Sequence, residues 1–124
     1  MNVTYEAIKA SSGNSFVHET ESQVILNGSR DINFTMDLVV KDVGIFDEIA
    51  RRQGVPLEIS PLLVDIFKDG IERYGPRELS PNIIRRLEDA CDVHVLGVGF
   101  PGEMTDDEPE EPGAEVVIPH RGDL

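Results

Sequence analysis

The longest regular pattern of apolar and polar positions lies between Asn33 and Gly54. At 100° per residue, its apolar side chains fall on one broad arc of a helix. These side chains are Leu38, Val39, Val43, Ile45, Phe46, Ile49 and Ala50. Thr35 is a suitable N-cap, and two arginines before Gly54 suit a helix C-terminus. The pattern predicts a central helix from Thr35 to Gln53.

Two shorter helices are predicted before it. The first covers residues 2–11, and Gly13 is expected to close it in a left-handed conformation. The second begins after Asn14 or Ser15, either of which can act as N-cap, and ends at Gly28. A short polar connection then leads into the central helix.

Two more helices are predicted after it. Apolar residues recur at spacings of three and four up to Tyr74, and Pro61 is compatible with a helix only in the first turn. Ser80 followed by Pro81 is typical of a helix start, with serine as N-cap and proline at the first helical position. This last helix is expected to end at about Cys91. The sequence therefore predicts an all-α fold, a compact bundle of about five helices.

The C-terminal part of the chain has a different composition. Residues 101–124 carry eight acidic residues and one arginine, which leaves −6 of the net charge of −13 for the first hundred residues. We expect a helical domain over 1–100 and an extended acidic tail, containing proline and glycine, over 101–124.

The same composition limits the partners and the location. The negative charge argues against nucleic acid and against anionic membrane surfaces. No stretch reaches the roughly 20 apolar residues that cross a membrane, and the N-terminus does not resemble a secretory signal. These features favour a soluble cytoplasmic protein.

Metal and thiol chemistry are not expected. Cys91 is the only cysteine, and we expect a buried thiol rather than a nucleophile activated by His94. The three histidines have no spacing typical of metal ligands, so no metal site is predicted.

One charge stands out within the central helix. Asp42 falls in the middle of the apolar arc, with Lys41 at its edge. Burying an ionised carboxylate alone is costly, so Asp42 must be paired, hydrogen-bonded or exposed in a cleft.

The residues around Asp42 resemble a known family. Phe34, Leu38 and the run Lys41-Asp42-Val43-Gly44 resemble the K-D-L-G-x-A-x-D motif of the β-hydroxyacid dehydrogenases, which include 3-hydroxyisobutyrate dehydrogenase and belong to the 6-phosphogluconate dehydrogenase-like superfamily. In this chain Phe46 replaces the alanine of the motif and Glu48 its final aspartate. The flanking segments SSGNS, GVPLEISPLLVDIF and LSPNIIRRLEDAC extend the resemblance over about residues 4–112.

The resemblance implies the helical C-terminal domain of such an enzyme, which supplies dimer contacts and one wall of the active-site cleft. The family binds NAD or NADP on a Rossmann domain with a G-x-G-x-x-G motif, and its catalytic lysine and asparagine lie in a G-x-x-x-K-x-x-x-N segment. This sequence contains neither. We therefore expect a fragment or split partner that needs a complementing Rossmann-domain chain, has no catalytic residue of its own, binds no cofactor tightly alone and forms a homo-oligomer.

The resemblance also assigns candidate site residues. Lys41 matches the lysine that approaches the nicotinamide end of the cofactor, although a solvated helix lysine is the ordinary alternative. Phe34 and Asp42 match positions that line the pocket for a small hydroxy acid; a core aromatic residue and an internally satisfied aspartate are their alternatives. Ser12 is a candidate for a substrate loop, but capping of the two flanking helices explains Ser11, Ser12 and Asn14 fully and is the preferred interpretation.

Two functions follow as hypotheses. The first is the substrate-pocket and dimerisation domain of an NAD(P)-dependent β-hydroxyacid dehydrogenase that is inactive alone. The alternative is a helical oligomerisation module, or one that binds a small carboxylate, without enzymatic activity.

Overall fold

The computed structural model describes residues 1–105 and residue 113, and within them the chain is entirely helical. The elements are α1 (Asn2–Lys9), α2 (Phe16–Asn27), α3 (Met36–Arg52), α4 (Ile59–Tyr74), the 3₁₀ helix η1 (Ser80–Ile84) and α5 (Arg85–Cys91). The described residues contain no strand. The prediction of an all-α fold with five helices is confirmed, and the central helix differs from its predicted bounds by one residue at each end.

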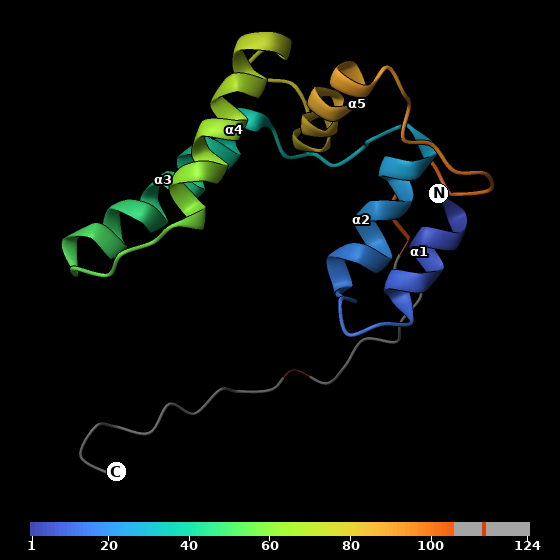
Figure 1. Ribbon diagram of the computed structural model, residues 1–124, viewed down its shortest axis with the longest axis horizontal. Coiled ribbons are helices and arrows are strands. Elements are labelled where there is room, and N and C mark those ends of the chain that lie inside the picture. Colours follow the sequence, from blue (N-terminus) through green and yellow to red (C-terminus); the bar gives the residue numbers. More distant parts are fainter. Residues whose placement is uncertain (106–112, 114–124) are drawn as a thin grey trace.

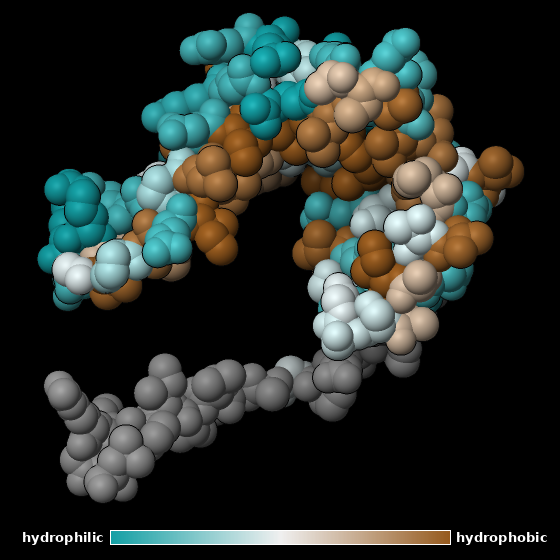
Figure 2. Space-filling model, in the orientation of Figure 1, coloured by the Kyte–Doolittle hydropathy of each residue, from teal (hydrophilic) through white to brown (hydrophobic). Residues whose placement is uncertain are grey.

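The helices form an arch (Figure 1). One leg is the pair α1 and α2, and the other is the antiparallel hairpin of α3 and α4. The short helices η1 and α5 lie at the crown between the legs. Apolar side chains gather on the inner side of the crown and of both legs, as Figure 2 shows.

The ends of α2 agree with the sequence, whereas the end of α1 does not. The amide of His18 donates to Ser15 Oγ at 3.0 Å, and Gly28 closes α2 with φ of 93°. Helix α1 instead ends at Lys9, and its C-cap residue is Ala10 with φ of −85°. The prediction of a left-handed Gly13 is wrong, because the Ser11 hydroxyl satisfies the turn by donating to the Ile8 carbonyl and accepting from the Gly13 amide.

The start of α3 is held by the segment that precedes η1. Thr35 is the N-cap, but its hydroxyl donates to the Asp37 carboxylate instead of accepting from a helix amide. The backbone of Thr35 pairs with that of Leu79, and the Met36 amide donates to the Glu78 carbonyl at 2.9 Å. This pairing fixes the N-terminus of α3 against the crown.

The same pairing explains why the prediction for Ser80 is wrong. Ser80 was expected to be an N-cap, but it is the first residue of η1, after Leu79. Its amide donates to the Phe34 carbonyl at 2.7 Å, so its backbone continues the pairing. The chain therefore enters a 3₁₀ turn first and becomes α-helical only at Arg85.

The core is small and lies near the crown. Val24 of α2 and Met36 of α3 are fully buried, and Ile32 between them and Phe67 of α4 are nearly so. Gly70 permits close packing there, because a Cβ at this position would lie 2.6 Å from Ile83 Cδ1. The apolar surface of both legs is covered only in part.

Residues 93–105 run beside the first leg without forming a strand. Asn2 exchanges hydrogen bonds with the backbone of Val98, and the Gly97 amide donates to the Leu26 carbonyl at 2.8 Å. Further along, Ser29 Oγ donates to the Gly102 carbonyl at 2.6 Å. The rest of the predicted acidic tail lies outside the described residues, and the domain boundary at residue 100 stays a prediction.

Candidate functional site

Lys41 and Asp42 lie together on the surface of α3. Lys41 Nζ is 3.0 Å from Asp42 Oδ1, and the two side chains are 58% and 52% exposed. Asp42 is therefore paired and accessible, as its place in the apolar arc required. The apolar residues beside it are also uncovered: Ile45, Phe46 and Ile49 are each more than half exposed.

The other two candidates are placed differently. Phe34 precedes α3, and its half-buried position and its carbonyl contact with Ser80 fix it near the crown. Ser12 is exposed in the loop between α1 and α2, at the free end of the other leg. The described chain thus brings Lys41 and Asp42 together and places Phe34 before the same helix. Ser12 is separated from them by the opening of the arch (Figure 1).

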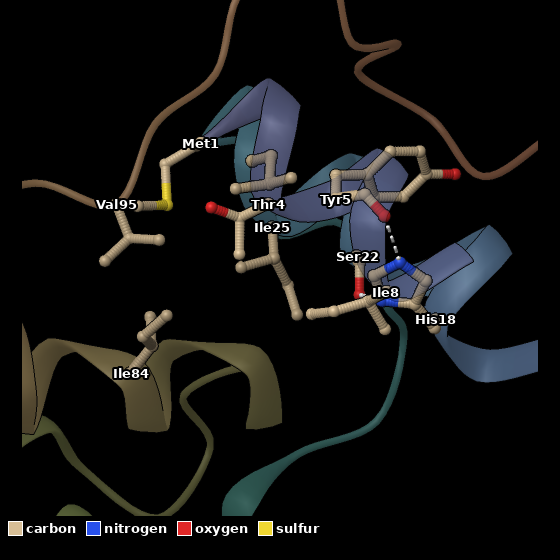
Figure 3. Close-up of a pocket in the computed structure, with 10 residues that line it drawn as sticks. Met1, Thr4, Tyr5, Ile8, His18, Ser22, Ile25, Ile84 and Val95 are labelled. Atoms are coloured by element: carbon tan, nitrogen blue, oxygen red, sulfur yellow. Dashed lines mark hydrogen bonds between the residues drawn. The ribbon is translucent and has the colours of Figure 1, made fainter. Parts of the chain in front are cut away.

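A cavity that the sequence did not reveal lies between the first leg and the crown. It has a volume of about 230 Å³ and is lined mainly by aliphatic side chains (Figure 3). Its lining residues are Met1, Thr4, Tyr5, Ile8, His18, Ser22, Ile25, Leu26, Ile84 and Val95. No acidic or basic side chain other than His18 contributes to this lining, so the cavity suits an apolar group rather than a carboxylate.

His18 is already engaged at the edge of this cavity. Its Nε2 lies 3.0 Å from the Tyr5 carbonyl, and its Nδ1 lies 3.3 Å from Ser22 Oγ. Since a carbonyl can only accept, Nε2 donates to it, and Nδ1 lies beside the serine hydroxyl. The ring also stacks on Tyr5. His18 therefore holds α1 against α2.

A buried ion pair at the crown is the second feature that the sequence did not reveal. Arg30, with φ of 53°, directs Nη1 to Asn82 Oδ1 at 2.9 Å and Nη2 to Glu88 Oε1 at 2.7 Å. Glu88 Oε1 also accepts from the Val95 amide at 2.7 Å. Burial opposes ionisation of Glu88, but these hydrogen bonds and the charge of Arg30 outweigh it and lower the pKa of Glu88. The pair joins the connection before α3 to η1, α5 and the segment after α5.

Cys91 is exposed, so the prediction of a buried thiol is wrong. It is the last residue of α5, and the chain turns away through Asp92 with φ of 52° before packing against the first leg. Among the described residues, no three histidine, cysteine or acidic side chains are grouped as metal ligands. No helix within this part of the chain has the length and apolar character needed to cross a membrane.

The comparisons with known proteins define the class. A family model described as NAD-binding of NADP-dependent 3-hydroxyisobutyrate dehydrogenase matches residues 1–87, which is the helical region up to the first residues of α5. The match covers more than half of the chain and therefore shows its family. The chain belongs to the 3-hydroxyisobutyrate dehydrogenase family.

A curated relative agrees with this assignment. The chain is 32% identical over 93 residues to the 2-(hydroxymethyl)glutarate dehydrogenase of Eubacterium barkeri. The matched segment covers 74% of this chain but only 31% of that relative, so the chain spans about a third of its length. No solved structure gave a significant match.

Proposed function

We propose that this chain is the C-terminal helical domain of an NAD(P)-dependent β-hydroxyacid dehydrogenase and contributes one wall of the substrate pocket and the dimer contacts. The observation that carries the proposal is the family match over the helical region, in a chain that spans about a third of its relative. The dinucleotide-binding motif and the catalytic lysine segment would come from a complementing polypeptide region. Alone, the described domain is expected to be inactive.

The shape of the arch supports a complementing region. Its inner side is apolar and concave (Figure 2), and exposed apolar patches of this kind mark interaction sites. A helix is a convex object that fits between two legs, whereas two concave faces placed against each other enclose empty space. We propose that the helix linking the Rossmann domain to this domain lies within the arch.

Lys41, Asp42 and Phe34 would then serve the cleft. The Lys41 ammonium can reach oxygen atoms of the cofactor from an exposed helix position, and Asp42 beside it can orient a basic group or a substrate hydroxyl. Phe34 can exclude water from the pocket wall. The nicotinamide, when bound, supplies the hydride chemistry, and the substrate is a small hydroxy acid.

A chimaera tests this proposal. The 93 matched residues of the Eubacterium barkeri enzyme are replaced by the matched segment of this chain, and reduction of NAD or NADP is followed with 2-(hydroxymethyl)glutarate and 3-hydroxyisobutyrate. We expect turnover by the chimaera and none by this chain alone. Lys41→Met should raise KM for the cofactor, whereas Lys68→Met, at an exposed position of α4, should leave it unchanged. A folded chimaera without turnover, or one indifferent to Lys41→Met, would refute the assignment.

The alternative is an oligomerisation or carboxylate-binding module without activity. The mutual pairing of Lys41 and Asp42 and the exposed apolar side of α3 are the observations that favour it. A folded chimaera that is silent, together with self-association of the isolated chain, would support the module.

A further inference from the structure

The cavity between the first leg and the crown can hold aliphatic side chains. Figure 3 shows Ile84 of η1 on one side of it and Met1 and Ile25 on the other. An aliphatic cavity of about 150 Å³ is large enough for a benzene ring. The volume of about 230 Å³ therefore accommodates about two branched aliphatic side chains. An apolar occupant would remove the lining from water, which is favourable.

The C-terminal part of the chain contains an apolar segment of the size this cavity requires. The sequence after the described region is rich in acidic residues, and Val116-Val117-Ile118 is the one run of consecutive β-branched residues in it. In an extended segment alternate side chains share a side, so Val116 and Ile118 form a pair and Val117 faces the other way. Pro119 favours an extended backbone at Ile118. The family model ends at residue 87, so the family match does not account for this segment.

The segment is tethered close to the cavity. Val95, which precedes it in the chain, already lines the cavity. Ser29 Oγ donates to the Gly102 carbonyl at 2.6 Å, which holds the chain about one turn beyond Ile25. From Gly102 to Ile118 an extended chain spans up to about 50 Å, whereas the 12 residues of α2 span about 18 Å. The tether can therefore reach the cavity from this anchor.

A second apolar groove, at the tip of the hairpin of α3 and α4, is a poorer site for this segment. Glu58 contributes to its lining, and the Ser60 hydroxyl in the same lining donates to Asp47 at 2.8 Å. Two carboxylates therefore lie at this groove, and Glu115 directly precedes the apolar segment. Like charges repel, whereas the lining of the cavity beside the crown includes no carboxylate. Charge and tether length favour the same cavity.

We propose that Val116 and Ile118 occupy the cavity between the first leg and the crown of their own chain. Short tethers give effective concentrations in the millimolar range, so a contact too weak to hold a separate peptide is occupied within one molecule. One consequence rests on the proposed function: the complementing region of the dehydrogenase has to displace the segment from the arch. A segment that occupies the cavity for about two thirds of the time weakens that binding about threefold.

Paramagnetic relaxation in the full chain tests the docking. A spin label is attached at Gly113→Cys in a Cys91→Ala background, because a Cβ at Gly113 meets nothing within 4 Å. The methyl signals of isoleucine residues are then recorded by NMR. We expect the signals of Ile25 and Ile84, which line the cavity, to be broadened. The signal of Ile59, at the tip of the hairpin, should stay sharp.

Two matched variants show which side of the segment docks. Ile118→Asp should abolish the broadening, because an unpaired carboxylate is costly to bury in an apolar cavity. Val117→Asp adds the same charge on the other side of the extended segment and should retain the broadening. Sharp signals of Ile25 and Ile84, equal effects of the two variants, or broadening of unlabelled chains mixed with labelled ones would each overturn the proposal.

Isothermal titration tests the competition separately. The Eubacterium barkeri polypeptide without the 93 matched residues is titrated into the wild type, Ile118→Asp and Val117→Asp. Ile118→Asp should bind it about threefold more tightly than the wild type, and Val117→Asp should bind it as the wild type does. Equal affinities of all three would overturn the competition. Binding by none of them would refute the proposed function instead, and the NMR experiment would still decide whether the segment docks.

Discussion

The buried pair of Arg30 and Glu88 should be a principal support of the crown. Glu88 is 5% exposed and its Oε1 accepts two hydrogen bonds of 2.7 Å, from Arg30 Nη2 and from the Val95 amide. Among the described residues, Glu88→Ala leaves the buried guanidinium of Arg30 with Asn82 as its remaining partner, and the Nε atom of Arg30 has no partner there even in the wild type. Removing one member of a buried pair costs about 3–5 kcal/mol, because the other charge stays buried.

That loss is large for a chain of this size. Small domains have a free energy of unfolding of about 5–15 kcal/mol, so Glu88→Ala should remove roughly a fifth or more of it. The expected fall in melting temperature is roughly 15–25 °C. Thermal and urea unfolding followed by circular dichroism measure it. Glu48→Ala, which breaks pairs on the exposed surface of α3, is the control and should change the melting temperature little.

A double variant separates the pair from simple loss of packing. Arg30→Met combined with Glu88→Met removes both charges and keeps apolar volume, and it should be more stable than Glu88→Ala, because no charge is left buried alone. If the free energy of unfolding of Glu88→Ala lies within about 1 kcal/mol of the wild-type value, the two ions are not buried together and the account of the crown is wrong.

Three further predictions follow from single positions. Because the pKa of Glu88 is lowered in the folded state, its contribution to stability is present above the ordinary value of 4.5 and is lost as the pH falls through the folded value. Between about pH 6 and 3, the free energy of unfolding in urea should therefore depend less on pH for Glu88→Gln than for the wild type. An equal dependence on pH in the two proteins would contradict this. Gly44→Ala should stabilise the chain by about 0.5–1 kcal/mol, since a Cβ there meets nothing within 4 Å. Gly70→Val should destabilise the chain, because the side chains of neighbouring elements occupy the space beside Gly70. Equal effects of the two variants in urea unfolding would argue against the packing of α4. Cys91 should react with Ellman's reagent in the native protein without denaturant, and a reaction that requires denaturant would show it to be covered.

Local signals in the sequence were sufficient for the helices but not for their arrangement. Helix α2 is capped by Ser15 and Gly28 as predicted, because capping depends on residues within one turn. Ser80 failed as a cap because the pairing of residues 34–36 with 78–80 uses its amide, and that contact joins segments more than 40 residues apart. The arch itself depends on such contacts.

For the candidate site too, the sequence indicates local features but not the contacts between distant segments. The apolar arc of α3 predicted that Asp42 must be paired or exposed, and it is both. No sequence pattern indicates the pair of Arg30 and Glu88, because the two residues are separated by 58 positions and each resembles a solvated charge. The cavity beside His18 had one local sign, the i, i+4 spacing of His18 and Ser22, which a helix brings into contact.

The central claim is that the arch binds a part of the complete dehydrogenase that lies outside the segment matched by this chain. The most direct measurement is isothermal titration of this chain with the Eubacterium barkeri polypeptide from which the 93 matched residues have been removed. We predict saturable one-to-one binding that Ile25→Asp, in the lining of the cavity between the first leg and the crown, weakens at least about tenfold while Lys68→Met does not. Absence of binding between two folded partners, or binding unaffected by Ile25→Asp, would contradict the account.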